Sequence, residues 1–230
     1  MKSFICESNY FAIALTLFIW HLANLLQRKT KSVLLHPILV SVSVIILLLI
    51  ASGIPNSVYQ EGMKPFSWLM TPATVCLAVP LYEQVRVLRK NLAAVMLGVL
   101  SGTLTSLITV AALCFLFRLE RTMTVSLLPK SVTSAMGAPV SEAIGGLSSI
   151  TVAVIIVTGI FGNIVCRTAC RLFRIHDPVA QGTAIGTSSH VIGTTKAYEL
   201  GEVQGAVSSL SLVLTGVITA FLIPLLSGII

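Results

Sequence analysis

Residues 181–230 read QGTAIGTSSHVIGTTKAYELGEVQGAVSSLSLVLTGVITAFLIPLLSGII, and their pattern is the most informative about the fold. Its first part, Gln181–Glu202, is rich in glycine, serine and threonine and contains His190 and Lys196. Its second part, from about Ala206 to Ile229, carries no charged residue and is long enough to cross a membrane as a helix. Polar, glycine-rich backbone is tolerated at membrane depth only inside protein or beside water, because unpaired peptide groups are costly in lipid. The stretch therefore predicts a helical membrane protein whose polar segment is shielded from lipid.

Five further apolar runs precede this stretch, each close to the length of a membrane-spanning helix. They cover about Tyr10–Leu26, Val33–Ser52, Phe66–Tyr82, Leu92–Phe117 and Leu147–Cys170. The chain of 230 residues is 55% hydrophobic and 10% charged, whereas soluble domains carry about 25% charged residues. This composition excludes a soluble enzyme, a disordered regulator and a disulfide-rich secreted module.

We therefore expect an all-α polytopic membrane protein with about six transmembrane helices and two re-entrant or broken polar elements. Residues 1–230 are predicted to form a single integral membrane domain, with mainly scaffold spans in 1–118 and a core with polar broken helices in 119–230. The net charge of +7 indicates bases in cytoplasmic loops rather than nucleic-acid binding. No nucleotide-binding loop, metal-ligand cluster or catalytic triad occurs in the sequence, so we expect no catalytic residue, metal or cofactor.

A second polar stretch, Thr122–Glu142, precedes the fifth apolar run and contains Pro129, Gly137 and Pro139. If both polar stretches enter and leave on one side, the N-terminus lies in the periplasm and nine bases lie in the cytoplasm. These bases are Arg28, Lys29, Lys31, Arg86, Arg89, Lys90, Arg167, Arg171 and Arg174. An ordinary span at Thr122–Glu142 would move the last three bases outside, against the positive-inside rule. A span broken at mid-membrane is the alternative.

An internal echo begins at the last residue of each polar stretch. Four residues recur sixty positions later, because Glu142, Gly145, Ser148 and Ser149 correspond to Glu202, Gly205, Ser208 and Ser209. Glycine and serine are common in this chain, so chance is the alternative explanation. In the hairpin topology one crossing separates the copies, which would then be inverted about the membrane plane. Inverted repeats with broken helices at mid-membrane are a common architecture of secondary transporters.

Six short motifs are distinctive: Leu128-Pro-Lys-Ser-Val-Thr133, Gly186-Thr-Ser-Ser-His-Val-Ile-Gly-Thr194, Pro80-Leu-Tyr-Glu-Gln84, Thr158-Gly-Ile-Phe-Gly162, Leu200-Gly-Glu202 and Gly205 to Leu210. In these motifs the chain resembles the LrgB/CidB family of bacterial membrane proteins. The resemblance extends from about His36 to the end of the chain. After Lys-Ser-Val the family commonly has Thr-Thr-Pro-Ile-Ala, whereas this chain continues Thr133-Ser-Ala-Met-Gly-Ala-Pro139, so its first helix breaker is shifted.

The resemblance implies two functions. Bacterial members are named as holin/antiholin-like regulators of murein hydrolase export and cell lysis that act with a small LrgA/CidA-type membrane partner. The plastid relative resembles a glycolate/glycerate transporter, and some bacterial relatives are linked to pyruvate uptake. We expect a secondary transporter or channel-like carrier for small carboxylates, with holin/antiholin-like regulation as the alternative. The expected location is the inner membrane, as a multi-pass protein and a homo-oligomer.

The candidate site residues come from the two polar stretches, since the resemblance implies no settled catalytic residues. A lysine at membrane depth usually faces a cavity, a counter-ion or a substrate. Lys130, with the neighbouring hydroxyls of Ser131, Thr133 and Ser134, is therefore predicted to bind the carboxylate of a small organic anion. The alternative is that Lys130 extends to water at the membrane surface.

His190 is the candidate in the second stretch, because histidine titrates near neutrality and could couple transport to protons. The predicted site includes its small and hydroxyl-bearing neighbours, which are Thr187, Ser188, Ser189, Gly193 and Thr194. A histidine that is simply hydrogen-bonded to a neighbouring helix is the alternative. Glu142, Lys196 and Glu202 are candidate coupling or structural charges. The acids either pair with Lys130 and Lys196 or are interfacial charges at helix N-termini.

Overall fold

The computed structural model describes residues 10–30, 37–76, 82 and 85–227, and every element among them is a helix. The chain forms two compact units, Met1–Cys76 and Leu77–Ile230, which we describe separately. Four helices in the described ranges are long and apolar enough to cross a membrane, and a shorter apolar helix accompanies them. The all-helical class predicted from the sequence is confirmed, whereas the count of six spans stays a prediction. The expectation of a single domain also stays a prediction.

The first unit contains α2 (Phe11–Thr30), α3 (Pro37–Ser52), α4 (Asn56–Gly62) and α5 (Lys64–Cys76). The candidate spanning helix α2 packs against α3 and α4. The hydroxyl groups of Thr16 and Tyr59 are hydrogen-bonded at 2.8 Å and join α2 to α4. The predicted span at 66–82 corresponds in part to α5. The Pro80–Gln84 motif lies outside the described residues except for Tyr82.

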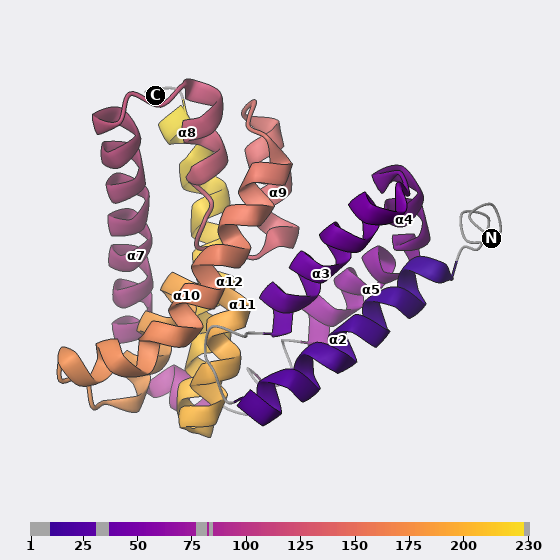
Figure 1. Cartoon of the computed structure of the whole chain (residues 1–230). Helices are drawn as coiled ribbons and strands as arrows, with labels where there is room; N and C mark the ends of the chain where they lie inside the picture. Colours follow the sequence, from indigo (N-terminus) through magenta and orange to yellow (C-terminus); the bar gives the residue numbers. More distant parts are fainter. Residues whose placement is uncertain (1–9, 31–36, 77–81, 83–84, 228–230) are drawn as a thin grey trace. The chain divides into compact units, whose positions relative to one another are not determined.

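The second unit contains α7, α8, α9, α10, α11 and α12 (Figure 1). Their bounds are Val85–Leu116, Arg121–Leu127, Ser134–Ala143, Ser148–Leu172, Pro178–Leu200 and Glu202–Ser227. Within this unit α7, α10 and α12 contain candidate membrane spans. The helix α11 packs against α7, α10 and α12, and α7 also packs against α12.

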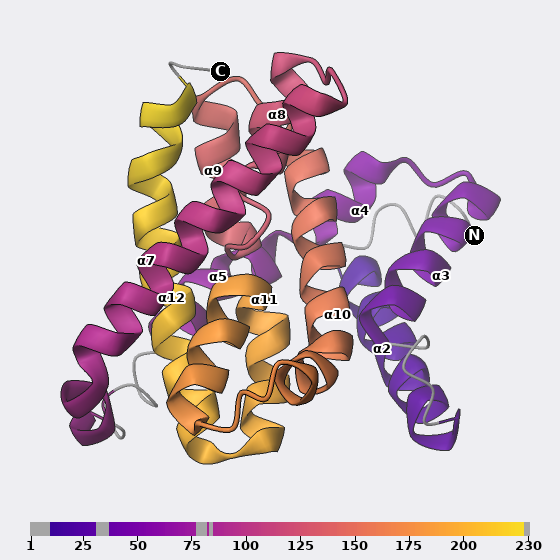
Figure 2. The same ribbon diagram turned by 90° about the vertical axis from the view of Figure 1, so that its left-hand side faces the viewer.

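The first polar stretch forms a helical hairpin, hairpin 1, which consists of α8, the tip 128–133 and α9. At 1.5 Å per residue these helices of 7 and 10 residues are about 10 and 15 Å long, so neither crosses the roughly 30 Å core of a bilayer. The beginning of α10 returns to α8, because Leu147 N donates to Ser126 Oγ at 2.7 Å. The chain therefore enters and leaves hairpin 1 at the same end of the unit (Figures 1 and 2).

The second polar stretch is also a hairpin, hairpin 2, although it forms one assigned helix, α11. At His190 the backbone turns sharply, with φ 43° and ψ −140°. A Cβ added at Gly193 would lie 3.2 Å from Ile185 Cγ2, whereas residues eight apart in a straight helix are about 12 Å apart. Ile185 and Ala197 also share a core cluster with Cys166 of α10. The halves 178–189 and 191–200 therefore lie side by side, with His190 at the tip.

The two hairpins are inverted relative to each other. Hairpin 1 precedes α10, hairpin 2 precedes α12, and these long helices run in opposite directions from opposite ends of the unit (Figure 2). The sixty-residue offset of the internal echo also pairs Lys130 with His190, and each of them lies at a hairpin tip. The echo therefore falls on two segments that occupy corresponding positions, each where a hairpin joins the long helix that follows it.

Candidate functional site

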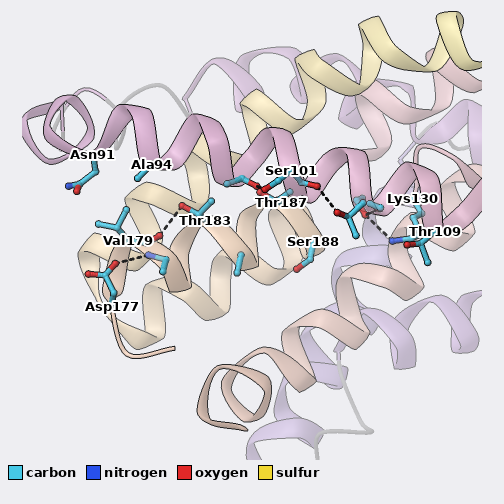
Figure 3. A pocket seen from close by; sticks show the side chains of 17 residues that line it. Asn91, Ala94, Ser101, Thr109, Lys130, Asp177, Val179, Thr183, Thr187 and Ser188 are labelled. Carbon is cyan, nitrogen blue, oxygen red and sulfur yellow. Dashed lines mark hydrogen bonds between the residues drawn. The ribbon is translucent and has the colours of Figure 1, made fainter. Parts of the chain in front are cut away.

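A cavity of about 730 Å³ lies within the second unit, between α7, the tip of hairpin 1 and the first half of α11. Its walls carry mainly small and hydroxyl-bearing side chains (Figure 3). The lining residues are Asn91, Ala94, Gly98, Ser101, Gly102, Thr105, Ser106, Thr109, Lys130, Ser131, Asp177, Val179, Ala180, Thr183, Ala184, Thr187 and Ser188. Both hairpins therefore contribute to one cavity.

Two glycines of α7 lie at the contact between α7 and α11 beside this cavity. A Cβ at Gly98 would lie 3.0 Å from Thr183 Cγ2, and one at Gly102 would lie 2.9 Å from Thr187 Cγ2. Larger side chains would push α11 away from α7. The absence of a Cβ therefore permits the close approach of α7 and α11, which both line the cavity.

Lys130 is the cation at one end of the cavity. Its side chain is partly buried, and Nζ donates to Ser131 Oγ at 3.0 Å. The Ser131 hydroxyl is in turn hydrogen-bonded to that of Ser106 on α7 at 3.1 Å. Lys130 forms no ion pair with a carboxylate of the described residues, unlike Lys64 and Lys196, which pair with Glu61 and Glu199. An ammonium group has three donors, and Lys130 therefore retains donor capacity toward the cavity.

Hairpin 2 contributes hydroxyl groups from the turn before its tip. The Thr187 hydroxyl is buried, lines the cavity and has no hydrogen-bond partner among the described residues. Ser188 also lines the cavity, and its Oγ is hydrogen-bonded to Ser189 Oγ at 2.9 Å. Of the predicted site residues, the structure thus brings together Lys130, Ser131, Thr187 and Ser188.

His190 faces α10 rather than this cavity. Its side chain is 3% exposed, and Nε2 lies 2.8 Å from the carbonyl oxygen of Ile155. Because a carbonyl only accepts, Nε2 carries the hydrogen. A Cβ at Gly159 would lie 2.6 Å from His190 Nε2, and one at Gly162 would overlap Ser189. The glycines of the Thr158–Gly162 motif therefore leave space for the tip of hairpin 2. His190 is hydrogen-bonded to a neighbouring helix, as the alternative interpretation of this residue expects.

The other predicted residues of the polar stretches lie outside the lining of the cavity. Thr194 Oγ1 is hydrogen-bonded to Ser208 Oγ of α12 at 2.8 Å, and Gly193 packs against the first half of α11. Thr133 precedes α9, and its carbonyl accepts from Gly137 N at 2.8 Å. Ser134, the first residue of α9, is partly buried.

The candidate coupling charges lie near helix ends. Lys196 forms an ion pair with Glu199 rather than with either echoed acid. Glu142 and Glu202 are exposed, and Glu202 lies in the first turn of α12. The interfacial alternative, in which an acid favours a helix N-terminus, fits Glu202.

The cavity extends from Lys130 and Thr109 toward Asn91 and Asp177 (Figure 3). Asp177 caps α11, because its Oδ1 accepts from Ala180 N at 2.8 Å. The beginning of α7 and the end of α10 lie at the same end of the second unit (Figure 2), and these two parts of the chain contain six bases. They are Arg86, Arg89, Lys90, Arg167, Arg171 and Arg174.

An apolar cluster joins α7, hairpin 1 and α12 beyond the Lys130 end of the cavity. It consists of Leu107, Val110, Cys114, Leu128 and Ile223, each 7% exposed or less. The cavity lining therefore continues toward the base-rich end and stops before this cluster. No group of three or more histidine, cysteine or acidic side chains that could hold a metal occurs among the described residues.

Sequence reasoning missed the α7 wall of the cavity. Ser101, Thr105, Ser106 and Thr109 lie on an otherwise apolar helix that was predicted as scaffold. Their signal in the sequence is the spacing of hydroxyl-bearing residues beside Gly98 and Gly102, which places small side chains on one helix face.

Comparisons with known proteins agree with these features. The model of the family described as LrgB-like matches residues 16–229. Two proteins named "Holin-like protein CidB", from two strains of Staphylococcus epidermidis, are each 35% identical over 214 residues, which cover 93% of this chain and 93% of each relative. No solved structure matches the chain. Together with the apolar helices, these relatives identify a multi-pass membrane protein.

Proposed function

The chain belongs to the LrgB-like family, and we propose that it is a secondary transporter or channel-like carrier for small carboxylates of the glycolate, glycerate, lactate and pyruvate class. Lys130 carries this proposal. It lies at one end of a hydroxyl-lined cavity of about 730 Å³ and has no ion-pair partner among the described residues. A lysine at membrane depth costs roughly 3 kcal/mol on insertion scales, and a bound anion would offset this cost.

The proposed binding mode uses groups from both hairpins. Lys130 Nζ donates to the substrate carboxylate in a charge-assisted hydrogen bond, which is stronger than a neutral one. Ser131 and Ser106 hold the ammonium group in place, because their hydroxyls form a chain that begins at Nζ. The Thr187 hydroxyl, which lacks a partner among the described residues, supplies a second donor from hairpin 2.

The distribution of bases supports an orientation. The positive-inside rule assigns the end with the six bases to the cytoplasm, which gives a cavity that faces the cytoplasm in this conformation. The same rule, applied to Arg28 and Lys29 at the end of α2, supports a periplasmic N-terminus in an inner-membrane protein. The apolar cluster around Leu128 then acts as the periplasmic barrier. A carrier cycle requires a second state in which this barrier opens and the cytoplasmic side closes.

Uptake into proteoliposomes tests the proposal. We expect wild-type protein to accumulate labelled glycolate, lactate or pyruvate and Lys130→Ala to lose most of this uptake. Lys196→Ala is the matched control, because this lysine is paired with Glu199 outside the cavity lining. It should retain uptake. Folded and correctly oriented wild-type protein that transports none of the three acids would refute the carrier proposal.

A holin-like regulator of murein hydrolase export and cell lysis is the second candidate. The name of the two 35% identical relatives supports it. In this role the protein would act with a small LrgA/CidA-type membrane partner or as a homo-oligomer. Lysis assays of Lys130→Ala discriminate between the candidates: regulation that persists without uptake would separate the two roles, whereas joint loss would make transport the basis of regulation.

A further inference from the structure

A second, much smaller cavity lies where the tip of hairpin 1 meets α7 and α12. Its polar lining consists of Thr103, Ser106, Ser131, Thr215 and Thr219, and its volume is about 10 Å³. Thr103 and Thr215 are 2% and 1% exposed, and neither hydroxyl has a hydrogen-bond partner among the described residues. Two buried, unpaired hydroxyl groups therefore share one small polar cavity.

The size and chemistry of this cavity fit one water molecule. A buried water needs roughly 10–15 Å³ and two to four polar partners. The lining supplies the hydroxyls of Thr103 and Thr215 and those of the Ser106–Ser131 pair. A cation fits poorly, because Ser131 already accepts from the Lys130 ammonium group and no lining residue is acidic.

The inverted repeat provides an independent reason to expect a hydrogen bond here. The sixty-residue offset pairs Lys130 with His190 and also pairs Ile155 with Thr215. At hairpin 2 the tip is bonded directly to the long helix, through His190 Nε2 and the carbonyl of Ile155. At hairpin 1 the equivalent contact with α12 contains the small cavity beside Thr215.

We propose that this cavity binds one ordered water molecule, which bridges Thr103 of α7 and Thr215 of α12 to the Ser106–Ser131 pair. The water holds the tip of hairpin 1 against both helices, as the His190 side chain holds the tip of hairpin 2 against α10. This site does not depend on transport, because it follows from the burial and pairing of hydroxyl groups alone.

Thermal unfolding of Thr103→Val and Thr215→Val tests the site. The substitutions should lower Tm if the cavity binds a water and raise it if the cavity is empty. Each variant removes a partner of a bridging water and should lower Tm by about 2–4 °C. The double variant should lose less than the sum of the single losses, since both act on one water. Without a water, each substitution would remove a buried unpaired hydroxyl and raise Tm.

Ser211→Ala is the matched control. Ser211 lies on α12, is fully buried, and does not line this cavity; its hydroxyl has no hydrogen-bond partner in the described part of the chain. Its substitution should leave Tm unchanged or raise it. If the two threonine variants behave like Ser211→Ala, or if their losses add fully, the water site is wrong. Stabilisation of wild type by sodium over N-methylglucamine that disappears in Thr215→Val would also overturn it in favour of a cation.

Discussion

Gly159→Ala provides the most direct test of how hairpin 2 is held. The substitution places a Cβ 2.6 Å from His190 Nε2 and 3.0 Å from Ile192 Cβ, so the imidazole ring must move. Movement of the ring breaks the hydrogen bond from His190 Nε2 to the carbonyl oxygen of Ile155, in which the two atoms lie 2.8 Å apart. The change therefore acts on the tip of hairpin 2 without altering any residue of that hairpin.

The expected magnitude follows from three terms. Overpacking of a well-packed interior costs about 1–3 kcal/mol, and a buried ring N–H of His190 that loses its acceptor costs about 1–3 kcal/mol. The higher helix propensity of alanine returns about 1 kcal/mol. The net loss is about 3 kcal/mol at mid-range, which corresponds to a Tm lower by about 6–12 °C for a domain of this size.

Thermal unfolding of detergent-solubilised protein measures this loss, and His190→Gly tests its cause. Glycine adopts positive φ without strain and removes the ring that Gly159→Ala displaces. The double variant should therefore be more stable than Gly159→Ala alone. Val157→Ala, on a 61% exposed position of α10, is the control and should leave Tm nearly unchanged. Additive losses from Gly159→Ala and His190→Gly would refute the contact between these residues.

Three further predictions follow from other parts of the structure. Gly102→Leu should separate α7 from α11, because even a Cβ would lie 2.9 Å from Thr187 Cγ2. Uptake should fall by tenfold or more. The control is Leu97→Ala, at a 68% exposed position of the same helix outside the cavity lining, and it should retain uptake. In a background without native cysteines, an impermeant thiol reagent should label Ser101→Cys from the cytoplasm. The control Val110→Cys is buried and should stay unlabelled. Labelling of Ser101→Cys from the periplasm alone would contradict a cavity that faces the cytoplasm. The hydrogen bond from Lys64 lowers the pKa of Glu61, so its small stabilising contribution should be present at neutral pH and lost as pH falls through the folded pKa. Because both side chains are exposed, Glu61→Gln should leave Tm and uptake unchanged at pH 7.

The hairpins were predictable because their composition conflicts with lipid. Glycine, proline and hydroxyl residues break the apolar pattern at 122–142 and 181–202, and the distribution of bases favours a return to the same side. The side to which the His190 side chain points, toward α10 rather than the cavity, was not predictable in the same way. It depends on the space that Gly159 leaves on α10, a helix that precedes the tip by about thirty residues and reaches it only through tertiary packing.

The α7 wall of the cavity was missed for a different physical reason. A serine or threonine hydroxyl within a helix can bond to the carbonyl three or four residues earlier. Thr105 Oγ1 donates to Ser101 O at 2.7 Å, and Ser101 Oγ donates to Gly98 O at 3.1 Å. The hydroxyl groups of such residues find hydrogen-bond acceptors within their own helix, so they add little to the free-energy cost of inserting that helix into a membrane. Hydropathy therefore identifies α7 as a candidate span and does not reveal that one face lines a cavity.

The same reasoning explains the polar face of α12. Ser208, Ser211, Thr215 and Thr219 recur every three or four residues and are each 4% exposed or less, so they occupy one buried helix face. Ser208 is hydrogen-bonded to Thr194 of hairpin 2, and Thr215 lines the small cavity beside the tip of hairpin 1. The polar face thus follows the two hairpins that pack on it. A valine at Thr215 or Thr219 would leave α12 apolar enough to span a membrane. The positions of the hydroxyls, rather than mean hydropathy, therefore mark α12 as the helix against which both hairpins pack.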